Sequence, residues 1–296
     1  MAVMSDFTIR PARPGDARGI ARLDVETWRT TYAGVLSTAY LVGLSERRRE
    51  AGWRGVILRE PRDVRVAVGS NGVILGFGSC GPNRGDRSFT GEVFTLYVAP
   101  DWQNRGIGRA LMQDVITRSH SRGAPGIRLL QATYHNRSLS LYTSLGFHVR
   151  ELLSVLQGKP LNLRFPGYDV RPATAVDAAA CDALCQDVHG FDRGKELTDA
   201  IGQGSAMVVE HQGQITGYTT GIAFFAHTVC RTNGDLQALI GAASEFGGPG
   251  FLLPTRNHEV FAWCLANGLR VAYPMTLMTI GLYNEPAGAW MPTVLY

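Results

Sequence analysis

The chain has 296 residues, of which 45% are hydrophobic and 18% are charged, so it can bury a sizeable core and predicts two domains. Mean hydropathy is −0.03, and no apolar run reaches the roughly 18 residues of a membrane span, so we expect neither a transmembrane protein nor a signal peptide. Five scattered cysteines do not form a disulfide framework and predict a cytoplasmic protein.

The charge is divided unevenly along the chain. Residues 1–150 hold 21 arginines against 12 acidic residues, a net charge of +9, whereas residues 151–296 hold eight basic and 13 acidic residues, a net charge of −5. The first half therefore predicts an anionic partner. Its arginines are scattered and form no basic stripe interleaved with aromatic residues, so we expect a phosphorylated cofactor and no nucleic acid.

The hydrophobic pattern of the first half predicts strands and helices on one mixed sheet. In chain order we expect a strand at 7–11, helices at 16–31 and 45–59, strands at 64–69, 73–81 and 91–98, a helix at 108–122, a strand at 127–133, a helix at 137–145 and a strand from 147. Strands followed by helices in this way indicate an α/β (α+β) fold class.

Three echoes in the same order indicate that the two halves are duplicates. The strand start at 7–12 returns at 168–173, and the strand, glycine turn and strand at 66–77 return at 207–218. The polar turn, helix and closing glycine at 136–147 return at 257–269. Residues 158–167 hold two prolines and two glycines and are expected to link a first domain of residues 1–157 to a second of residues 168–296.

The informative segment is 91–112, where an apolar strand stopped by Pro100 leads into a glycine loop and then a helix. A glycine loop between a strand and a helix N-terminus predicts an anion site. Gly106 and Gly108 allow the backbone to approach a ligand and to point N–H groups at phosphate oxygens, while Arg105 and Arg109 add full charges.

Two other motifs, one for dinucleotide binding and one for metal binding, lack the surroundings that their function requires. Residues 76–81 spell a dinucleotide fingerprint but open no helix, so a hairpin strand of small residues is the better interpretation. Cys181, Cys185 and His189 share a helical face, yet positions eight apart lie about 12 Å from one another, too far for one metal ion. We interpret them as core residues and expect no metal.

On these motifs the sequence resembles the GCN5-related N-acetyltransferase (GNAT) family, well over residues 7–150 and weakly over 168–283. The loop 103–108 fits the family signature Gln/Arg-x-x-Gly-x-Gly/Ala, 96–98 lies where the family binds the pantetheine arm, and 136–147 looks like its Asn…Leu-Tyr-x-x-x-Gly-Phe helix. The resemblance implies two tandem acyl-CoA N-acyltransferase-like domains with acetyl-CoA as co-substrate.

The resemblance also implies roles for particular residues. Glu92 matches the general base, with an ordinary strand glutamate as the alternative, and Tyr142 matches the general acid, with a structural tyrosine as the alternative. Trp28 and Tyr32 look like the acceptor wall, although a core role fits them equally well. The implied cofactor-binding residues are Leu96, Tyr97, Val98, Gln103, Asn104, Arg105, Gly106, Ile107, Gly108, Arg109 and Asn136.

The second half departs from the family pattern. Its corresponding segment, 225–236, holds one glycine, and Asp235 at the expected helix start would repel phosphate. We therefore expect a degenerate second domain and at most one coenzyme per chain; one role for this domain is to complete the acceptor pocket. The apolar tail 290–296 is expected to pack on its own chain or on another chain. A homodimer is therefore one of the expected alternatives.

The expected function is transfer of the acetyl group of acetyl-CoA to a primary amine of a small molecule, without a membrane partner. Two alternatives remain. One is acetylation of a protein N-terminus or lysine, and the other is a non-catalytic module that binds or senses coenzyme A.

Overall fold

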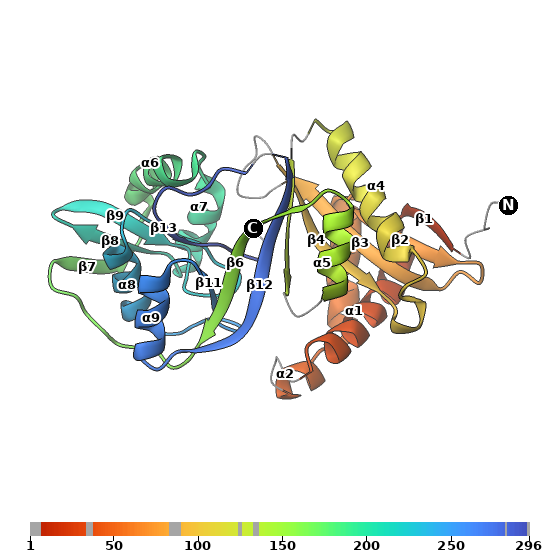
Figure 1. The fold of residues 1–296 in the computed structure, drawn as a ribbon, viewed down its shortest axis with the longest axis horizontal. Coiled ribbons are helices and arrows are strands. Elements are labelled where there is room, and N and C mark those ends of the chain that lie inside the picture. The colour runs from red at the N-terminus through yellow and green to blue at the C-terminus, as the bar shows by residue number, and fades with distance from the viewer. Residues whose placement is uncertain are drawn as a thin grey trace. The chain divides into compact units, whose positions relative to one another are not determined.

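The structure is a computed structural model that describes residues 7–33, 38–82, 90–123, 126–132, 136–281 and 283–294 (Figure 1). Contacts divide the chain into two compact units. The first comprises Met1–Pro82 and Thr90–Leu129, and the second comprises Asn83–Phe89 and Leu130–Tyr296. The predicted domain boundaries follow the repeated sequence rather than these contacts, and they remain a prediction.

The first unit is built on a mixed sheet. Its strands are β1 (Phe7–Pro11), β2 (Val64–Gly69), β3 (Ile74–Pro82), β4 (Thr90–Val98) and β5 (Gly126–Ala132), whose residues from Leu130 onward belong to the second unit. Its helices are α1 (Ala17–Thr31), α2 (Thr38–Val42), α3 (Glu46–Arg59) and α4 (Ile107–Ser121). Neighbouring strands follow chain order and are antiparallel, except that β4 and β5 are parallel. The predicted α/β class is confirmed.

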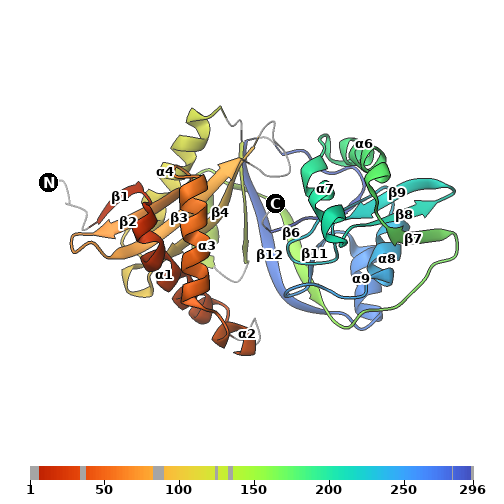
Figure 2. The same ribbon diagram turned by 180° about the vertical axis from the view of Figure 1, so that it is seen from behind.

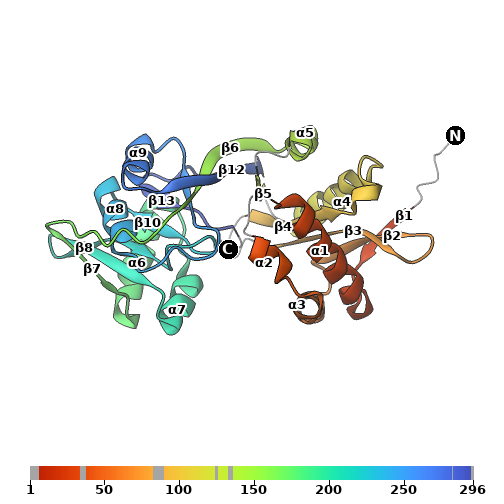
Figure 3. The same cartoon turned by 90° about the horizontal axis from the view of Figure 1, so that it is seen from below.

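Helices cover both faces of this sheet: α1 and α3 lie on one face and α4 lies on the other (Figures 2 and 3). Phe77 packs with the residues of α1 and α3, whereas Ile107 and Leu111 of α4 pack on the opposite face. Gly76 of β3 permits this contact, since a Cβ there would lie 3.1 Å from Ile107 Cγ2 and 3.3 Å from Leu111 Cδ1. The interpretation of residues 76–81 as a hairpin strand is confirmed.

The second unit contains two groups of antiparallel strands. Its strands are β6 (His148–Gln157), β7 (Tyr168–Pro172), β8 (Met207–His211), β9 (Gln214–Thr219), β10 (Thr228–Cys230), β11 (Phe251–Pro254), β12 (Arg270–Gly281) and β13 (Ala289–Met291). Its helices are α5 (Asn136–Ser144), α6 (Ala178–His189), α7 (Gly194–Gln203), α8 (Asn233–Ala242) and α9 (His258–Ala266). One sheet has the order β13-β10-β9-β8-β7, and β6 pairs with both β12 and β11.

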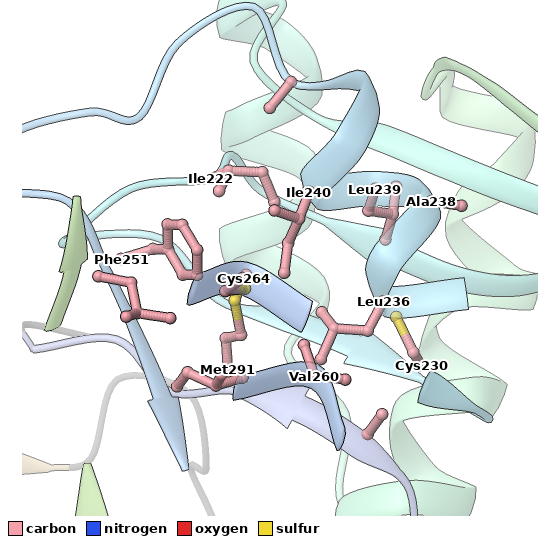
Figure 4. Close-up of a cluster of buried hydrophobic side chains, with 14 of the residues drawn as sticks. Ile222, Cys230, Leu236, Ala238, Leu239, Ile240, Phe251, Val260, Cys264 and Met291 are labelled. Carbon is pink, nitrogen blue, oxygen red and sulfur yellow. The ribbon is translucent and has the colours of Figure 1, made fainter. Parts of the chain in front are cut away.

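A buried apolar cluster holds α8, α9, β11 and β13 of this unit together (Figure 4). The segment 158–167 contains no helix or strand, but Phe165 packs against the cluster and Leu163 N–H donates to Gly241 O at 2.8 Å, so the expected linker lies on the unit. Trp290 and Met291 are buried in β13, which pairs with β10, so this part of the tail packs on its own chain. Residues 295–296 lie outside the described residues.

The buried cysteines behave as core residues. Cys181 and Cys185 are fully buried in an apolar cluster of α6, as expected, and all five cysteines of the chain are buried and free. Among the described residues, no helix combines the length and the apolar character that crossing a membrane requires.

Candidate active site

The N-terminus of α4 is the predicted anion cradle of the first unit. Gly106 precedes the helix with φ +83°, a left-handed conformation that glycine adopts without strain, and no side chain caps the helix. The loop residues 103–106 are exposed. Because the first N–H groups of a helix lack partners within it, this end presents backbone donors and a partial positive charge.

Cationic side chains flank this loop. The Arg105 guanidinium lies 4.7 Å from the centroid of the Trp102 ring, and Arg109 is exposed on the first turn of α4. Gln103 connects the loop to the end of β4, since its Nε2 donates to Val98 O at 3.4 Å. The predicted phosphate-binding residues are thus held together at one end of the sheet.

Among the described residues of the first unit, the end of β4 has an open edge, because β5 pairs only with its beginning. Its parallel register with β5 runs from Thr90 to Val93, whereas β4 itself continues to Val98. The register with β3 shifts between Val93 and Thr95, which marks a bulge at Phe94 just where the last β5 pair lies.

The hydrogen-bond alternation of a strand decides which residues face the open edge. Ala99 N–H donates to Leu75 O at 2.9 Å, so Tyr97 also directs its N–H and C=O groups toward β3. Leu96 and Val98 direct theirs to the opposite edge. The two outer residues of the predicted pantetheine segment therefore lie on the open edge, and Tyr97 contributes its side chain on the face of α1.

Glu92 is a buried carboxylate that accepts a hydrogen bond at one of its two oxygens. It is 2% exposed, and its Oε1 accepts from an Arg128 guanidinium nitrogen at 3.1 Å across the β4–β5 register. Its Oε2 is buried and has no hydrogen-bond partner among the described residues. A buried carboxylate oxygen without a donor is costly, so this atom is suited to accept a proton from a substrate.

Aromatic residues of α1 and α2 form a wall on the α1 face of the first sheet. The ring centroids of Trp28 and Tyr32 lie 4.9 Å apart, and Tyr40 of α2 lies 6.4 Å from Trp28. Arg29 holds α2 in place. Its guanidinium donates to Leu41 O of α2 at 3.1 Å and also to Leu44 O just after the helix.

An acidic residue is buried behind this wall. Asp24 accepts from Trp53 Nε1 at 2.9 Å and lies 3.6 Å from the Arg49 guanidinium, which in turn lies over the Trp28 ring at 4.9 Å. Burial raises the pKa of Asp24, and Trp53 and Arg49 oppose that rise. The predicted residues Trp28 and Tyr32 therefore have both packing contacts and polar neighbours.

Two of the predicted site residues lie in the second unit. Tyr142 is buried in α5 with its ring edge-to-face against Phe147, the centroids 5.9 Å apart. Asn136 begins α5, and its side chain is outside the described residues. The first unit holds Trp28, Tyr32, Glu92, Leu96, Tyr97, Val98, Gln103, Asn104, Arg105, Gly106, Ile107, Gly108 and Arg109.

The corresponding helix of the second half, α8, has its N-terminus filled. Thr232 caps it, and the buried Asp235 Oδ2 accepts from Thr232 N at 2.9 Å and from Thr232 Oγ1 at 2.6 Å. The Tyr168 hydroxyl lies against Gly234. The N-terminus of α8 is thus capped, and the Asp235 carboxylate in its first turn would repel a phosphate.

Sequence reasoning missed the polar partners of the site, namely Asp24, Arg29, Arg49 and Arg128. Asp24 gave a signal, because it stands between apolar residues on the buried side of α1. Arg128 gave a weaker one, as a charged residue inside an apolar strand. Neither pattern identifies the partner, which the tertiary fold supplies.

Comparisons with known proteins agree with this fold and with the position of the loop. Residues 24–147 match the sequence model of the Acetyltransferase (GNAT) family. The chain is 35% identical over 106 residues to the uncharacterized N-acetyltransferase YuaI of Bacillus subtilis, which covers 36% of this chain and 60% of YuaI. It is 38% identical over 61 residues to the mycothiol acetyltransferase of Thermobifida fusca, covering 21% of this chain and 19% of that protein.

A solved structure matches the whole chain. The crystal structure of a GCN5-related N-acetyltransferase from Sphaerobacter thermophilus has a TM-score of 0.64 at 17% identity and covers 100% of this chain and 99% of its own. At that identity the match establishes the fold alone. The similarity to the Acetyltransferase (GNAT) family thus lies in residues 24–147, and the chain covers 60% of YuaI and 19% of the mycothiol acetyltransferase, less than two thirds of either relative.

Proposed function

We propose that the protein transfers the acetyl group of acetyl-CoA to a primary amine of a small molecule. The observation that carries the proposal is the uncapped α4 N-terminus with Gly106 in the left-handed conformation, beside the open edge of β4 and within the GNAT segment. Such an end suits the pyrophosphate of coenzyme A, and the N–H group of Leu96 suits its pantetheine arm. We expect one coenzyme per chain, because the N-terminus of α8 is capped and the Asp235 carboxylate in its first turn would repel phosphate.

The reaction needs two proton transfers. An amine with a pKa of about 10.4 is neutral in under one molecule in a thousand at pH 7, which is equivalent to about 4–5 kcal/mol. Glu92 Oε2 takes this proton, and the amine nitrogen then attacks the thioester carbonyl carbon. The carbonyl oxygen is polarised by the Val98 N–H, and as the carbon–sulfur bond breaks Tyr142 gives a proton to the leaving thiolate. The nitrogen still carries the extra proton of the attacking amine; it releases that proton to solvent and becomes the amide, and Tyr142 recovers a proton from solvent.

The buried, partly unsatisfied Glu92 supports an enzyme over a module that only binds coenzyme A. A binding module gains nothing from a buried carboxylate oxygen without a donor, whereas a base requires one. A small-molecule acceptor fits the aromatic wall of Trp28 and Tyr32, and one relative of the chain is a mycothiol acetyltransferase. Acetylation of a protein N-terminus or lysine is the second candidate.

The double variant Glu92→Gln with Tyr142→Phe tests the catalytic assignment. We expect turnover of an amine panel, measured as release of free coenzyme A thiol, to fall by at least about 100-fold, the scale of general acid–base catalysis. The dissociation constant of acetyl-CoA should stay within about twofold, since both substitutions keep the size of the side chain and neither residue belongs to the α4 loop, residues 103–106. Turnover that persists in the double variant would show that the base and acid are other residues.

A further inference from the structure

Strand β10 of the second unit is the counterpart of β4 in the first. In the first unit Tyr97 of β4 pairs with Phe77 of β3, and the sequence echo aligns Phe77 with Tyr218 of β9. In the second unit Tyr218 pairs with Val229 of β10. Val229 therefore has the position of Tyr97, and the neighbours of Val229 have the positions of the two residues on the open edge of β4.

The backbone of β10 is also oriented like that of β4. Arg231 N–H donates to Thr216 O of β9 at 2.8 Å, which is the counterpart of the bond that orients the end of β4. Val229, two residues earlier, therefore directs its backbone groups toward β9 as well. Thr228 and Cys230 direct theirs to the other edge, which corresponds to the open edge of β4.

The C-terminal strand β13 occupies this edge of the second unit. It pairs antiparallel with β10, so that Ala289 lies opposite Cys230 and Met291 lies opposite Thr228. Ala289 and Met291 are 5% and 2% exposed and belong to the buried apolar cluster in which Figure 4 labels Met291. The backbone of β13 thus takes the place that the pantetheine arm has in the proposed function of the first unit.

Trp290, the central residue of β13, packs on the opposite face. It is 7% exposed, and its ring lies edge-to-face against the His189 ring of α6, with the centroids 5.7 Å apart. Helices α1 and α6 correspond, because each begins after an aspartate that an arginine of the preceding strand binds, Asp16 and Asp177. Counted from these aspartates, His189 has the position of Trp28, so Trp290 lies beside the counterpart of the aromatic wall.

The residues before β13 fit closely against the same elements. A Cβ on Gly288 would overlap Cys230 O, so only glycine allows this approach of the two backbones. Ala287 N–H donates to Val188 O of α6 at 2.8 Å. The whole C-terminal segment, residues 287–293, carries no charged side chain, so the acidic first turn of α8 does not repel it as it would repel a phosphate.

We propose that this edge of the second unit binds an extended peptide, and that the C-terminal segment is its tethered ligand. A peptide strand and a pantetheine arm both offer amide groups to a strand edge, so one geometry suits either. The ligand class is an uncharged strand with tryptophan at its centre and glycine two residues before it. The comparison with the β4 edge rests on the proposed function, whereas the peptide site itself depends only on contacts within the second unit.

Cleavage of the folded, full-length chain tests the proposal. A protease recognition sequence is inserted after Glu285, which is exposed, and the purified protein is cut there. We expect the cut protein to stay folded and to exchange its released segment for a fluorescently labelled peptide of residues 286–294, measured by anisotropy. A peptide with Trp290→Ala should bind at least about 30-fold more weakly, the scale of a buried aromatic anchor, and one with Gly288→Val should not bind. Ala287→Ser, at an exposed position, is the matched control and should bind within about twofold of the native peptide.

Hydrogen exchange of the uncut chain gives a second measurement that needs no cleavage. In the Trp290→Ala variant the amides of Thr228 and Cys230 should exchange at least about tenfold faster, because β13 covers them. The Val229 amide is directed toward β9 and should keep its wild-type rate.

Loss of the fold on cleavage, or equal acceleration of all three β10 amides, would show that β13 is an integral strand and would overturn the proposal. A labelled peptide that does not bind, or that binds equally well without Trp290, would overturn it too. Titration of the uncut chain with acetyl-CoA separates these results from the proposed function. A chain that binds no acetyl-CoA but exchanges its C-terminal segment would refute acetyl transfer and support the peptide site.

Discussion

A single ion pair orients the buried carboxylate of Glu92. Arg128 binds one of its oxygens, while the other oxygen has no donor among the described residues. The sequence indicated Glu92 through its place in the strand before the glycine loop. It did not indicate Arg128, because the register of two parallel strands joined through a helix depends on tertiary packing.

A second buried carboxylate makes stability depend on pH. Burial alone would raise the pKa of Glu196, but the charge of Arg193 and the contact with His227 Nδ1 at 2.9 Å outweigh it and lower the pKa to about 2. A carboxylate whose pKa is lower in the folded state than in the unfolded state stabilises the protein at pH values above its unfolded-state pKa. This stabilisation is lost as the pH falls toward the folded-state pKa. We expect about 3 kcal/mol of unfolding free energy to disappear between about pH 5 and pH 2.

Chemical denaturation of the wild type and Glu196→Gln across this pH range measures the effect. The variant should be less stable at pH 7, and its free energy of unfolding should fall less steeply between about pH 5 and pH 2 (the acid limb). Glu50→Gln is the matched control, because Glu50 pairs with Arg54 on the exposed side of α3. Equal acid limbs for wild type and Glu196→Gln would refute the role of this carboxylate.

At the scale of elements, the distance between α4 and its sheet determines where the anion cradle lies. Gly76→Ala would place a methyl group 3.0 Å from Tyr97 O and 3.1 Å from Ile107 Cγ2. We expect a loss of about 1–3 kcal/mol of unfolding free energy and weaker acetyl-CoA binding, since the helix end must shift.

Gly52→Ala in α3 is the control for this substitution. A Cβ at Gly52 meets nothing within 4 Å, so alanine should raise stability by about 0.5–1 kcal/mol through its better helix propensity and leave acetyl-CoA binding unchanged. Thermal unfolding measures the stability of both variants, and titration with acetyl-CoA measures their affinity for the coenzyme. A Gly76→Ala protein as stable as the wild type would contradict the close approach of α4.

Local patterns predicted most of the first half. Each expected helix and strand there agrees with the structure to within one residue at its ends, because apolar periodicity and glycine or proline stops act over short distances. The short helix α2 was missed, since five residues give too little periodicity. The pairing of β6 with β12 was missed as well, because these strands lie more than 100 residues apart and no local signal specifies their register.

At the scale of the whole molecule, the two halves repeat a plan but differ at one helix end. In the first unit no side chain caps the N-terminus of α4, and in the second unit Thr232 and Asp235 form a capping box at the N-terminus of α8. The opposite net charges of the two halves agree with the proposal that only the arginine-rich half binds an anion.

The most direct test of this account is a calorimetric titration of acetyl-CoA into the purified chain, with fitted affinity and stoichiometry. We predict one site per chain, lost in Gly106→Val because a β-branched residue is strained at φ +83° and blocks the approach of phosphate. Two sites per chain would contradict the closed α8 terminus. No binding at all would contradict the central claim that the α4 loop is a coenzyme site.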